Sequence, residues 1–309
     1  SHCPWQEGAM TKLKEAGARV TLNNILYLTD FSEPSEAALP FAAAVAREYG
    51  AKVIAYHALI PAAYTYTAPE LVQTGLEAQE EAAENNMKRA EAELVGVPHE
   101  MVVERSAGIW TSLEQAIKDY NADLIVLGTH GRTGAEKLLL GSVAEEVFRR
   151  ARVPVLTIGP GAPRSPHAGA KFHKVLYATD FSKESLAAAP YAISMAEENQ
   201  ARLILLYVMK PSATPLSERE AQDALSNATF QLHEIVPPSA ELWCTAEAIV
   251  REGNAAEQIL ETAKEKGADL IVLGVRDRKG HLGAATHLER ATAHKVVAHA
   301  ACPVLTVRD

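Results

Sequence analysis

The stretch Ile25-Leu-Tyr-Leu-Thr-Asp-Phe-Ser32 decides the fold because it occurs twice, returning 150 positions later as Val175-Leu-Tyr-Ala-Thr-Asp-Phe-Ser182. A second phrase, Ala122-Asp-Leu-Ile-Val-Leu-Gly128, returns without change as Ala268-Asp-Leu-Ile-Val-Leu-Gly274. Self-similarity in the same order along the chain is the signature of a repeated structural unit. The sequence therefore predicts a duplicated domain.

Each copy reads as strands alternating with helices. A Pro-Val-Leu-Thr phrase closes both copies, beginning at Pro154 and at Pro303. Continuous apolar runs such as Leu124-Ile-Val-Leu127 are typical of parallel strands covered by helices on both faces. We therefore expect two tandem α/β domains, each an open five-stranded parallel sheet in three α/β/α layers, with the flavodoxin- or Rossmann-like strand order 3-2-1-4-5.

The pattern also predicts element and domain boundaries. Strands are expected in the first copy at 24–29, 52–59, 100–105, 123–128 and 154–158, and in the second at 174–179, 202–208, 241–247, 269–275 and 303–308. Helices are expected in the first copy at 34–49, 69–95, 109–120 and 142–152. The predicted divisions are a tail over 1–22, a first domain over 23–160, a Gly- and Pro-rich linker over 161–171 and a second domain over 172–309.

The last strand of each copy opens with proline, which is tolerated mainly on an edge strand. Both of these edges are apolar, and an exposed apolar edge needs to be covered. We expect the two last strands to pair or pack together, which would make the chain an internal pseudo-dimer. Two chains could also associate as a homodimer.

Composition narrows the class of protein. Of the 309 residues 48% are hydrophobic and 22% charged, as in a folded globular chain. The net charge of −9, without a large Lys/Arg cluster, disfavours nucleic acid or an anionic membrane as the main partner. We also find no apolar run long enough to span a membrane and no secretion signal. The three cysteines, Cys3, Cys244 and Cys302, show no CxxC spacing and suit a reducing compartment, so we expect a cytoplasmic protein.

The chemistry is expected at the carboxyl ends of the first and fourth strands, where ligands bind in open parallel sheets. In the first copy these ends carry Thr29-Asp30 and Gly128-Thr-His-Gly131, and Gly141-Ser142 then precedes a helical stretch. The spacing is Gly-x2-Gly-x9-Gly-Ser. Glycines without a β-carbon let the backbone turn sharply and approach a bulky polar ligand.

A helix entrance at Gly141-Ser142 favours an anion, because the first N–H groups of a helix have no partner within it. These are the N–H groups of Ser142, Val143 and Ala144, with the Ser142 hydroxyl beside them. Arg132 lies close enough in sequence to reach a phosphate. Asp30, across the cleft, could serve a ribose hydroxyl or a phosphate-bound Mg²⁺. Together these residues predict a phosphate cradle.

The repeated Thr-Asp-Phe-Ser phrase, the Ala-Asp-Leu-Ile-Val-Leu-Gly strand and the glycine spacing resemble the universal stress protein family in its ATP-binding branch. The resemblance covers roughly 23–159 and 172–309. It implies that ATP or another adenine nucleotide, with or without Mg²⁺, is bound, and that the backbone of Ala58 meets the adenine edge. Leu28 stands where relatives often have Pro, Ala or Val. The implied binding residues are Leu28, Thr29, Asp30, Ala58, Gly128, Thr129, His130, Gly131, Arg132, Gly141, Ser142, Val143 and Ala144.

Plainer interpretations stay open for several of these residues. Asp30 could simply cap the following helix, and Gly128 could simply allow a tight turn. His130 has no evident catalytic partner in the sequence, and the histidines of the second copy lack zinc-motif spacing.

The second copy differs at the cradle, although it keeps the residues that match the other side of the site: Thr179, Asp180 and Val208. Asp277 stands where the first copy has Gly131. Counting back from the final proline puts Arg290 and Ala291 opposite the Gly-Ser pair. Arginine at a helix entrance would lack glycine's close approach, and Asp277 would repel phosphate. We expect no triphosphate in the second copy.

Three functions are compatible with these features. The first is an ATP-binding protein of stress response or signalling, favoured because no GxxxxGK[ST] loop, nucleophile elbow or HExxH motif is present. The second is a slow ATPase, or a phosphotransferase acting on Ser142. The third is a nucleotide-independent dimeric scaffold.

Overall fold

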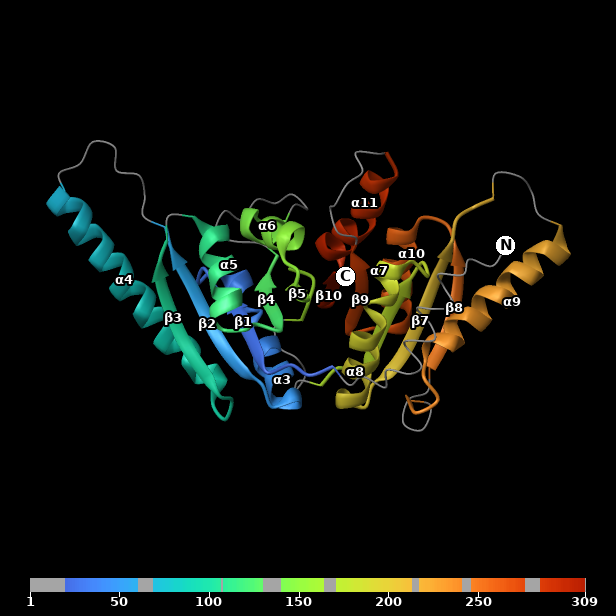
Figure 1. Cartoon of the computed structure of the whole chain (residues 1–309), viewed down its shortest axis with the longest axis horizontal. Coiled ribbons are helices and arrows are strands. Elements are labelled where there is room, and N and C mark those ends of the chain that lie inside the picture. Colours follow the sequence, from blue (N-terminus) through green and yellow to red (C-terminus); the bar gives the residue numbers. More distant parts are fainter. Residues whose placement is uncertain are drawn as a thin grey trace. The chain divides into compact units, whose positions relative to one another are not determined.

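The computed structural model describes residues 20–60, 69–106, 108–129, 140–163, 171–212, 217–240, 246–275 and 284–308, with the backbone alone for 69–74 and 284–291. The chain divides into an N-terminal unit, Leu22–Pro160, and a C-terminal unit, Lys171–Asp309 (Figure 1). Both are α/β domains.

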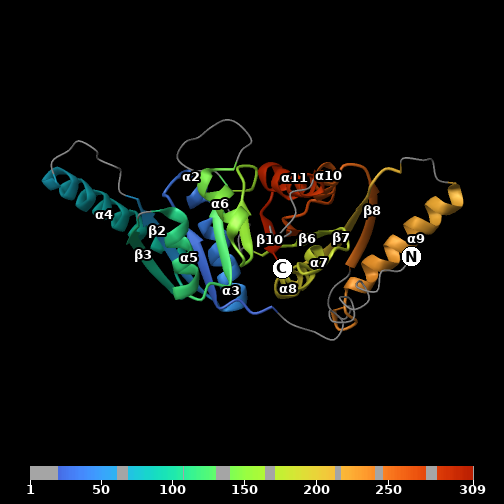
Figure 2. The ribbon, with the colours of Figure 1, turned by 45° about the horizontal axis from the view of Figure 1, so that its top comes forward.

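The N-terminal unit contains a parallel sheet in the order β3-β2-β1-β4-β5. Its strands are β1 (Asn24–Leu28), β2 (Lys52–Leu59), β3 (His99–Arg105), β4 (Leu124–Gly128) and β5 (Val155–Ile158). Its helices are α2 (Glu33–Glu36), α3 (Leu39–Tyr49), α4 (Pro69–Glu91), followed by a 3-10 turn over Ala92–Leu94, α5 (Ile109–Asp119) and α6 (Ser142–Arg150). Helices α2, α3 and α4 pack on one face of the sheet, and α5 and α6 pack on the other (Figure 2).

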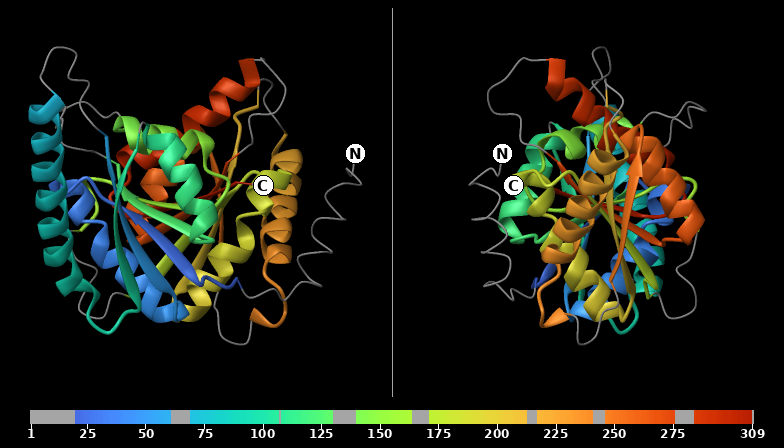
Figure 3. Two further views of the ribbon diagram at one scale, coloured as in Figure 1. Left: turned by 60° about the vertical axis from the view of Figure 1, so that its left-hand side comes forward. Right: turned by 90° about the vertical axis from the view of Figure 1, so that its right-hand side faces the viewer.

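The C-terminal unit repeats this arrangement with the order β8-β7-β6-β9-β10. Its strands are β6 (Lys174–Thr179), β7 (Arg202–Met209), β8 (Ala246–Glu252), β9 (Leu270–Val275) and β10 (Val304–Arg308). Its helices are α7 (Lys183–Leu186), α8 (Ala189–Asn199), α9 (Glu218–Ile235), α10 (Ala255–Lys266) and α11 (Ala284–His299). Figure 3 shows helices on both faces of each sheet. The predicted fold class and strand order are therefore confirmed in both copies.

One aspartate in each Ala-Asp-Leu-Ile-Val-Leu-Gly phrase ties the first strand to the fourth. The Asp123 carboxylate accepts the backbone N–H groups of Asn23 and Asn24, at 2.7 and 2.9 Å. Asp269 accepts the N–H groups of His173 and Lys174, at 2.8 and 3.0 Å. The repeated phrase thus fixes the register of the two central strands from their amino ends.

The single helix predicted over 34–49 is two helices, α2 and α3. Pro40 lies in the first turn of α3. A proline in a helix interior lacks an N–H donor and clashes with the carbonyl four residues earlier, so the first helix ends at Glu36. The C-terminal unit breaks in the same way before Pro190, between α7 and α8.

The strand predicted over 241–247 is wrong by several residues, because β8 spans Ala246–Glu252. It pairs with β7 from Leu203 opposite Ala246 to Met209 opposite Glu252. As the outer strand of its sheet, β8 is only half-buried and carries charged residues, so it lacks the apolar run that marks the central strands.

Within the described residues, no helix is long and apolar enough to cross a membrane.

Candidate functional site

The carboxyl ends of β1 and β4 are adjacent in the N-terminal sheet, since Ile25, Leu26 and Tyr27 pair with Leu124, Ile125 and Val126. The chain leaves β1 for α2 and α3 on one face, and leaves β4 for α6 on the other. Strand order reverses between these two strands, which is where an open α/β sheet forms a ligand crevice.

Hydrogen bonds fold the loop after β1 tightly on itself. The Asp30 carboxylate accepts the Ser32 N–H at 3.0 Å and the Ser32 hydroxyl at 2.5 Å. Ser32 in turn caps α2 through the Ser35 N–H, and the Thr29 hydroxyl lies 3.2 Å from that of Ser35. Asp30 therefore holds the cap residue of α2, while its side chain stays partly exposed at the sheet edge.

Phe31, inside this loop, has a left-handed backbone with φ of 59°. Such a conformation is uncommon for a bulky residue and costs of order 1–3 kcal/mol. The Thr29 hydroxyl oxygen accepts the Phe31 N–H at 3.0 Å. The Phe31 ring packs against the His57 imidazole, with centroids 4.4 Å apart. These contacts hold the turn in place.

The end of β2 lies beside this loop. The Thr29 N–H donates to the Tyr56 carbonyl at 3.1 Å, so the backbone of Tyr56 faces β1. Backbone groups alternate sides along a strand, so the N–H and C=O of Ala58 face β1 as well. The last β1–β2 pair is Leu28 with Tyr56, so Ala58 lies beyond the end of β1.

Gly128 at the end of β4 has a structural reason to be glycine. A β-carbon there would lie 2.3 Å from the Pro34 carbonyl oxygen, which is far inside contact distance. The close approach that the sequence suggested is thus made, within this structure, to the backbone of α2. Packing explains this glycine by itself, and its contact with a ligand stays a prediction.

The start of α6 is fixed to the end of β4. The Gly141 N–H donates to the Thr129 carbonyl at 2.7 Å, and the Thr129 N–H donates to Ile158 at 2.9 Å. Gly141 is the N-cap of α6 and makes no side-chain capping bond. Within the described residues, nothing accepts the first-turn N–H groups of Ser142, Val143 and Ala144, as expected at a helix start.

The structure therefore brings most of the predicted residues to one sheet edge. These are Leu28, Thr29, Asp30, Ala58, Gly128, Thr129, Gly141, Ser142, Val143 and Ala144. His130, Gly131 and Arg132 lie outside the described residues. No sequence motif pointed to His57, whose contacts with Phe31 and Thr29 help to shape the carboxyl end of the sheet.

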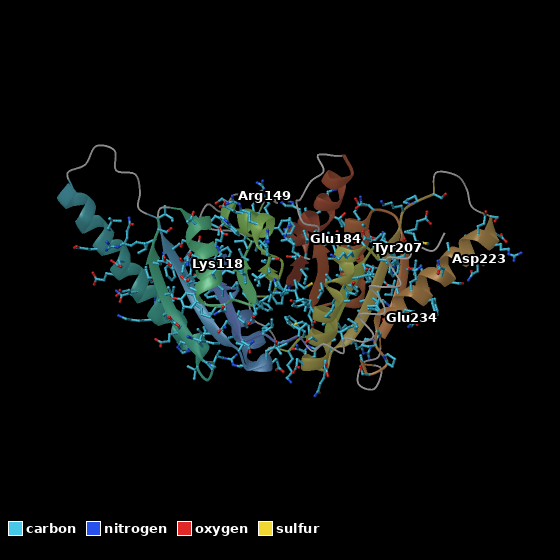
Figure 4. The ribbon with its side chains drawn as sticks, in the orientation of Figure 1. Lys118, Arg149, Glu184, Tyr207, Asp223 and Glu234 are labelled. Carbon is cyan, nitrogen blue, oxygen red and sulfur yellow. The ribbon has the colours of Figure 1, made fainter. Side chains whose placement is uncertain are left out.

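The C-terminal unit has the same first-strand loop. Asp180 accepts the Ser182 N–H and hydroxyl at 3.0 and 2.5 Å, and Phe181 has φ of 59°. The Phe181 ring packs on Tyr207, labelled in Figure 4, with centroids 4.7 Å apart. Burial, followed by the Asp180 charge, raises the pKa of Tyr207. Asp277 lies outside the described residues.

The helix after the fourth strand differs between the units. Arg290 and Ala291 were expected at a helix entrance, and this is wrong: α11 begins at Ala284, so both lie inside the helix. The segment Ala284–Glu289 contains neither Gly nor Pro and includes good helix formers such as Ala, Leu and Glu. Helix α11 consequently starts about two turns before the position equivalent to Ser142.

Among the described residues, no group of three or more His, Cys, Asp or Glu side chains is arranged to hold a metal ion. The suggested role of Asp30 toward a phosphate-bound Mg²⁺ therefore stays a prediction.

Comparison with known proteins matches the universal stress protein family over residues 21–159 and 171–308, which is most of the chain. The chain belongs to the universal stress protein family. The family resemblance noted in the sequence is thus confirmed, with both copies matched. A universal stress protein of Mycolicibacterium smegmatis is 27% identical over 298 residues, covering 92% of this chain and 96% of that protein.

Two further similarities concern a single copy and the whole fold. Universal stress protein YxiE of Bacillus subtilis is 33% identical over 150 residues, covering 44% of this chain and 99% of its own. The crystal structure of a universal stress protein from Archaeoglobus fulgidus covers 94% of this chain and 99% of its own, with a TM-score of 0.68 and 20% identity. This universal stress protein therefore has tandem copies of a fold that also occurs singly.

Proposed function

We propose that this universal stress protein binds an adenine nucleotide, such as ATP, in its N-terminal unit and acts as a nucleotide-responsive binding protein in stress response or signalling. The observation that carries the proposal is the start of α6. The bond from Gly141 to Thr129 holds the first turn of α6 at the carboxyl end of β4. Three backbone N–H groups and the positive end of the helix dipole then lie at the carboxyl end of β4, where they suit a phosphate.

The other end of the nucleotide has a complementary position at β2. The N–H and C=O of Ala58 form a donor and acceptor pair beyond the end of β1. Adenine offers an amine donor beside a ring-nitrogen acceptor, which such a pair can match. Asp30 lies between the two ends, where an ionised carboxylate can accept hydrogen bonds from ribose hydroxyls. These hydrogen-bonding groups therefore suit a nucleotide without a metal site built from protein side chains.

The chain supplies a matched pair of variants for the test. Asp30→Asn and Asp180→Asn alter two carboxylates that make the same contacts at the same distances, to Ser32 and Ser182. Any cost to the loop should therefore be similar in both variants. We expect Asp30→Asn to weaken ATP binding about tenfold, as loss of a charged hydrogen bond does, and Asp180→Asn to leave it unchanged.

Isothermal titration of the wild type and both variants with ATP, AMP and cyclic AMP measures these affinities. No binding by the wild type would favour the nucleotide-independent scaffold and contradict the proposal. An equal loss in both variants would also contradict it, because the effect would then come from the loop alone. ADP production above a no-protein control that disappears in Asp30→Asn would favour the ATPase alternative.

Three further expectations stay predictions: pairing of the last strands into a pseudo-dimer, homodimer formation and a cytoplasmic location. Size measurement in solution tests the homodimer. The strand pairing is tested by expressing the two units separately and measuring whether they associate. Mutations in β5 or β10 should abolish that association.

A further inference from the structure

We propose that His57 is a positioning residue that sets adenine specificity: it takes up the Thr29 carbonyl and thereby leaves the Ala58 N–H available to a ligand. This inference rests on the proposed nucleotide function. The imidazole Nδ1 lies 2.8 Å from the Thr29 carbonyl oxygen. A carbonyl oxygen can only accept, so Nδ1 carries the proton and donates.

The ladder between β1 and β2 shows what this bond replaces. In a parallel pair the bonds are evenly spaced, and a strand facing its neighbour donates and accepts at every second residue. Tyr56 accepts the Thr29 N–H, so the next donor toward β1 is the Ala58 N–H and its natural acceptor is the Thr29 carbonyl. His57 occupies that acceptor. Among the described residues, the Ala58 N–H donates no backbone hydrogen bond on the β1 side.

The C-terminal unit shows the alternative outcome. Tyr207 stands where the N-terminal unit has His57, and its ring offers no nitrogen donor. There the first strand runs one residue further, and the ladder includes the pair Thr179–Tyr207. In the N-terminal unit the ladder stops at Leu28–Tyr56. The strand therefore ends earlier in the unit whose second strand carries the histidine.

Packing holds the His57 ring in place. The side chain is buried, with 9% of its surface exposed, and its ring lies against Phe31. Phe31 is held in its left-handed conformation by the Thr29 hydroxyl, so the loop and the imidazole support each other. A ring fixed at this place ends the ladder at Tyr56, two residues before Ala58, and shapes the end of β2 that would meet the base.

The test uses the full chain with His57→Phe, which keeps an aromatic ring on Phe31 but cannot donate. His57→Asn restores an N–H donor near the position of Nδ1, and Tyr207→Phe is the matched change in the other unit. Amide hydrogen exchange of the nucleotide-free protein is followed at Ala58 by NMR, with the Leu26 amide in the central strand reporting that the sheet is intact. The ratio of ATP to GTP affinity is measured by titration.

In His57→Phe we expect the Ala58 amide to exchange about tenfold more slowly, because it now bonds to Thr29, and the preference for ATP over GTP to fall about tenfold. His57→Asn and Tyr207→Phe should resemble the wild type in both measurements. Unchanged Ala58 exchange, or an unchanged ATP to GTP ratio, in His57→Phe would overturn the inference. A wild type that binds no adenine nucleotide would instead overturn the proposed function, while the exchange measurement still decides whether His57 frees the amide.

Discussion

The two units agree at the first strand and differ after the fourth. Each has an aspartate holding the cap serine of the next helix and a phenylalanine at φ of 59°. Yet α6 begins at Ser142, whereas α11 begins at Ala284, seven residues before Ala291, the equivalent of Ser142. The backbone N–H groups that α6 presents at its start correspond to groups inside α11, where carbonyls four residues earlier accept them.

This difference separates residues that build the fold from residues that would bind a ligand. The Thr-Asp-Phe-Ser loop has the same contacts in both units, although the helix after the fourth strand starts differently in each, so the loop is a structural feature that both sheets share. The start of the helix after the fourth strand distinguishes the units more sharply.

The largest effect is expected at the two glycines that end the fourth strands. A β-carbon on Gly128 would lie 2.3 Å from the Pro34 carbonyl oxygen, and one on Gly274 would lie 2.2 Å from that of Glu184. Because backbone must move to relieve either clash, Gly128→Ala and Gly274→Ala should each lower the free energy of unfolding of their own unit by about 2–3 kcal/mol. Urea unfolding combined with hydrogen exchange assigns the loss to a unit.

Gly108→Ala is the control for these glycine changes. Its backbone is extended, and its β-carbon would meet nothing closer than the Thr111 hydroxyl at 4.0 Å. Its effect should stay within about 1 kcal/mol, the range of an N-cap change. If Gly128→Ala weakened nucleotide binding without lowering stability, the glycine would be serving the ligand and the packing explanation would be wrong.

A smaller effect is expected at the buried tyrosines of the first strands. The Tyr27 hydroxyl donates to the Ser35 carbonyl at 2.9 Å, and that of Tyr177 donates to Ser185 at 2.6 Å. Burial raises the pKa of both phenols, so they remain neutral donors. Tyr27→Phe and Tyr177→Phe should each cost about 1 kcal/mol, because a buried carbonyl loses one of its hydrogen bonds and keeps only that from the N–H of Ala38 or Ala188. The same urea and exchange measurements apply, and a loss confined to one unit would show that the two loops are not equivalent.

Much of the fold followed from the repeat, and the exceptions have local causes. The phrases around Tyr27 and Tyr177 located the central strands because those strands are buried on both faces and nearly all apolar. The edge strand β8 was misplaced because its half-exposed sequence resembles a loop. The nearest repeated phrase is displaced by 146 positions, from Ala122 to Ala268, and the same displacement moves the first-copy strand at 100–105 to 246–251, inside β8.

The site was only partly visible in the sequence. Spacing located the start of α6 at Gly141-Ser142, because a glycine before a helical pattern is a local signal. The contact of Gly128 with Pro34 depends on how the sheet and α2 pack, which no local pattern records. The role of His57 depends likewise on where β1 ends. The early start of α11 was missed because counting from the final proline aligns positions but does not show where a helix begins.

The smallest effect concerns the long helix α9 of the C-terminal unit. Ser217 and Glu220 form a capping box there: the Ser217 hydroxyl accepts the Glu220 N–H, and the Glu220 carboxylate accepts the Ser217 N–H at 2.9 Å. The corresponding helix of the N-terminal unit, α4, instead begins with Pro69, which is pre-shaped for a first turn. Acid should therefore loosen the start of α9. The start of α4 has no such capping box among the described residues, so we expect no equivalent effect there.

The Ser217 hydroxyl and N–H lower the pKa of Glu220, and this shift decides how the stability of the first turn of α9 changes with pH. A carboxyl whose pKa is lower in the folded protein stabilises it above the unfolded pKa, and this contribution is lost as pH falls through the folded value. We expect amide protection in the first turn of α9 to decrease below about pH 4, the ordinary range of a glutamate pKa. An NMR titration of the carboxyl measures the pKa directly. In Ser217→Ala it should rise toward its ordinary value, and a pKa that stays low in this variant would show that the capping box is not its cause.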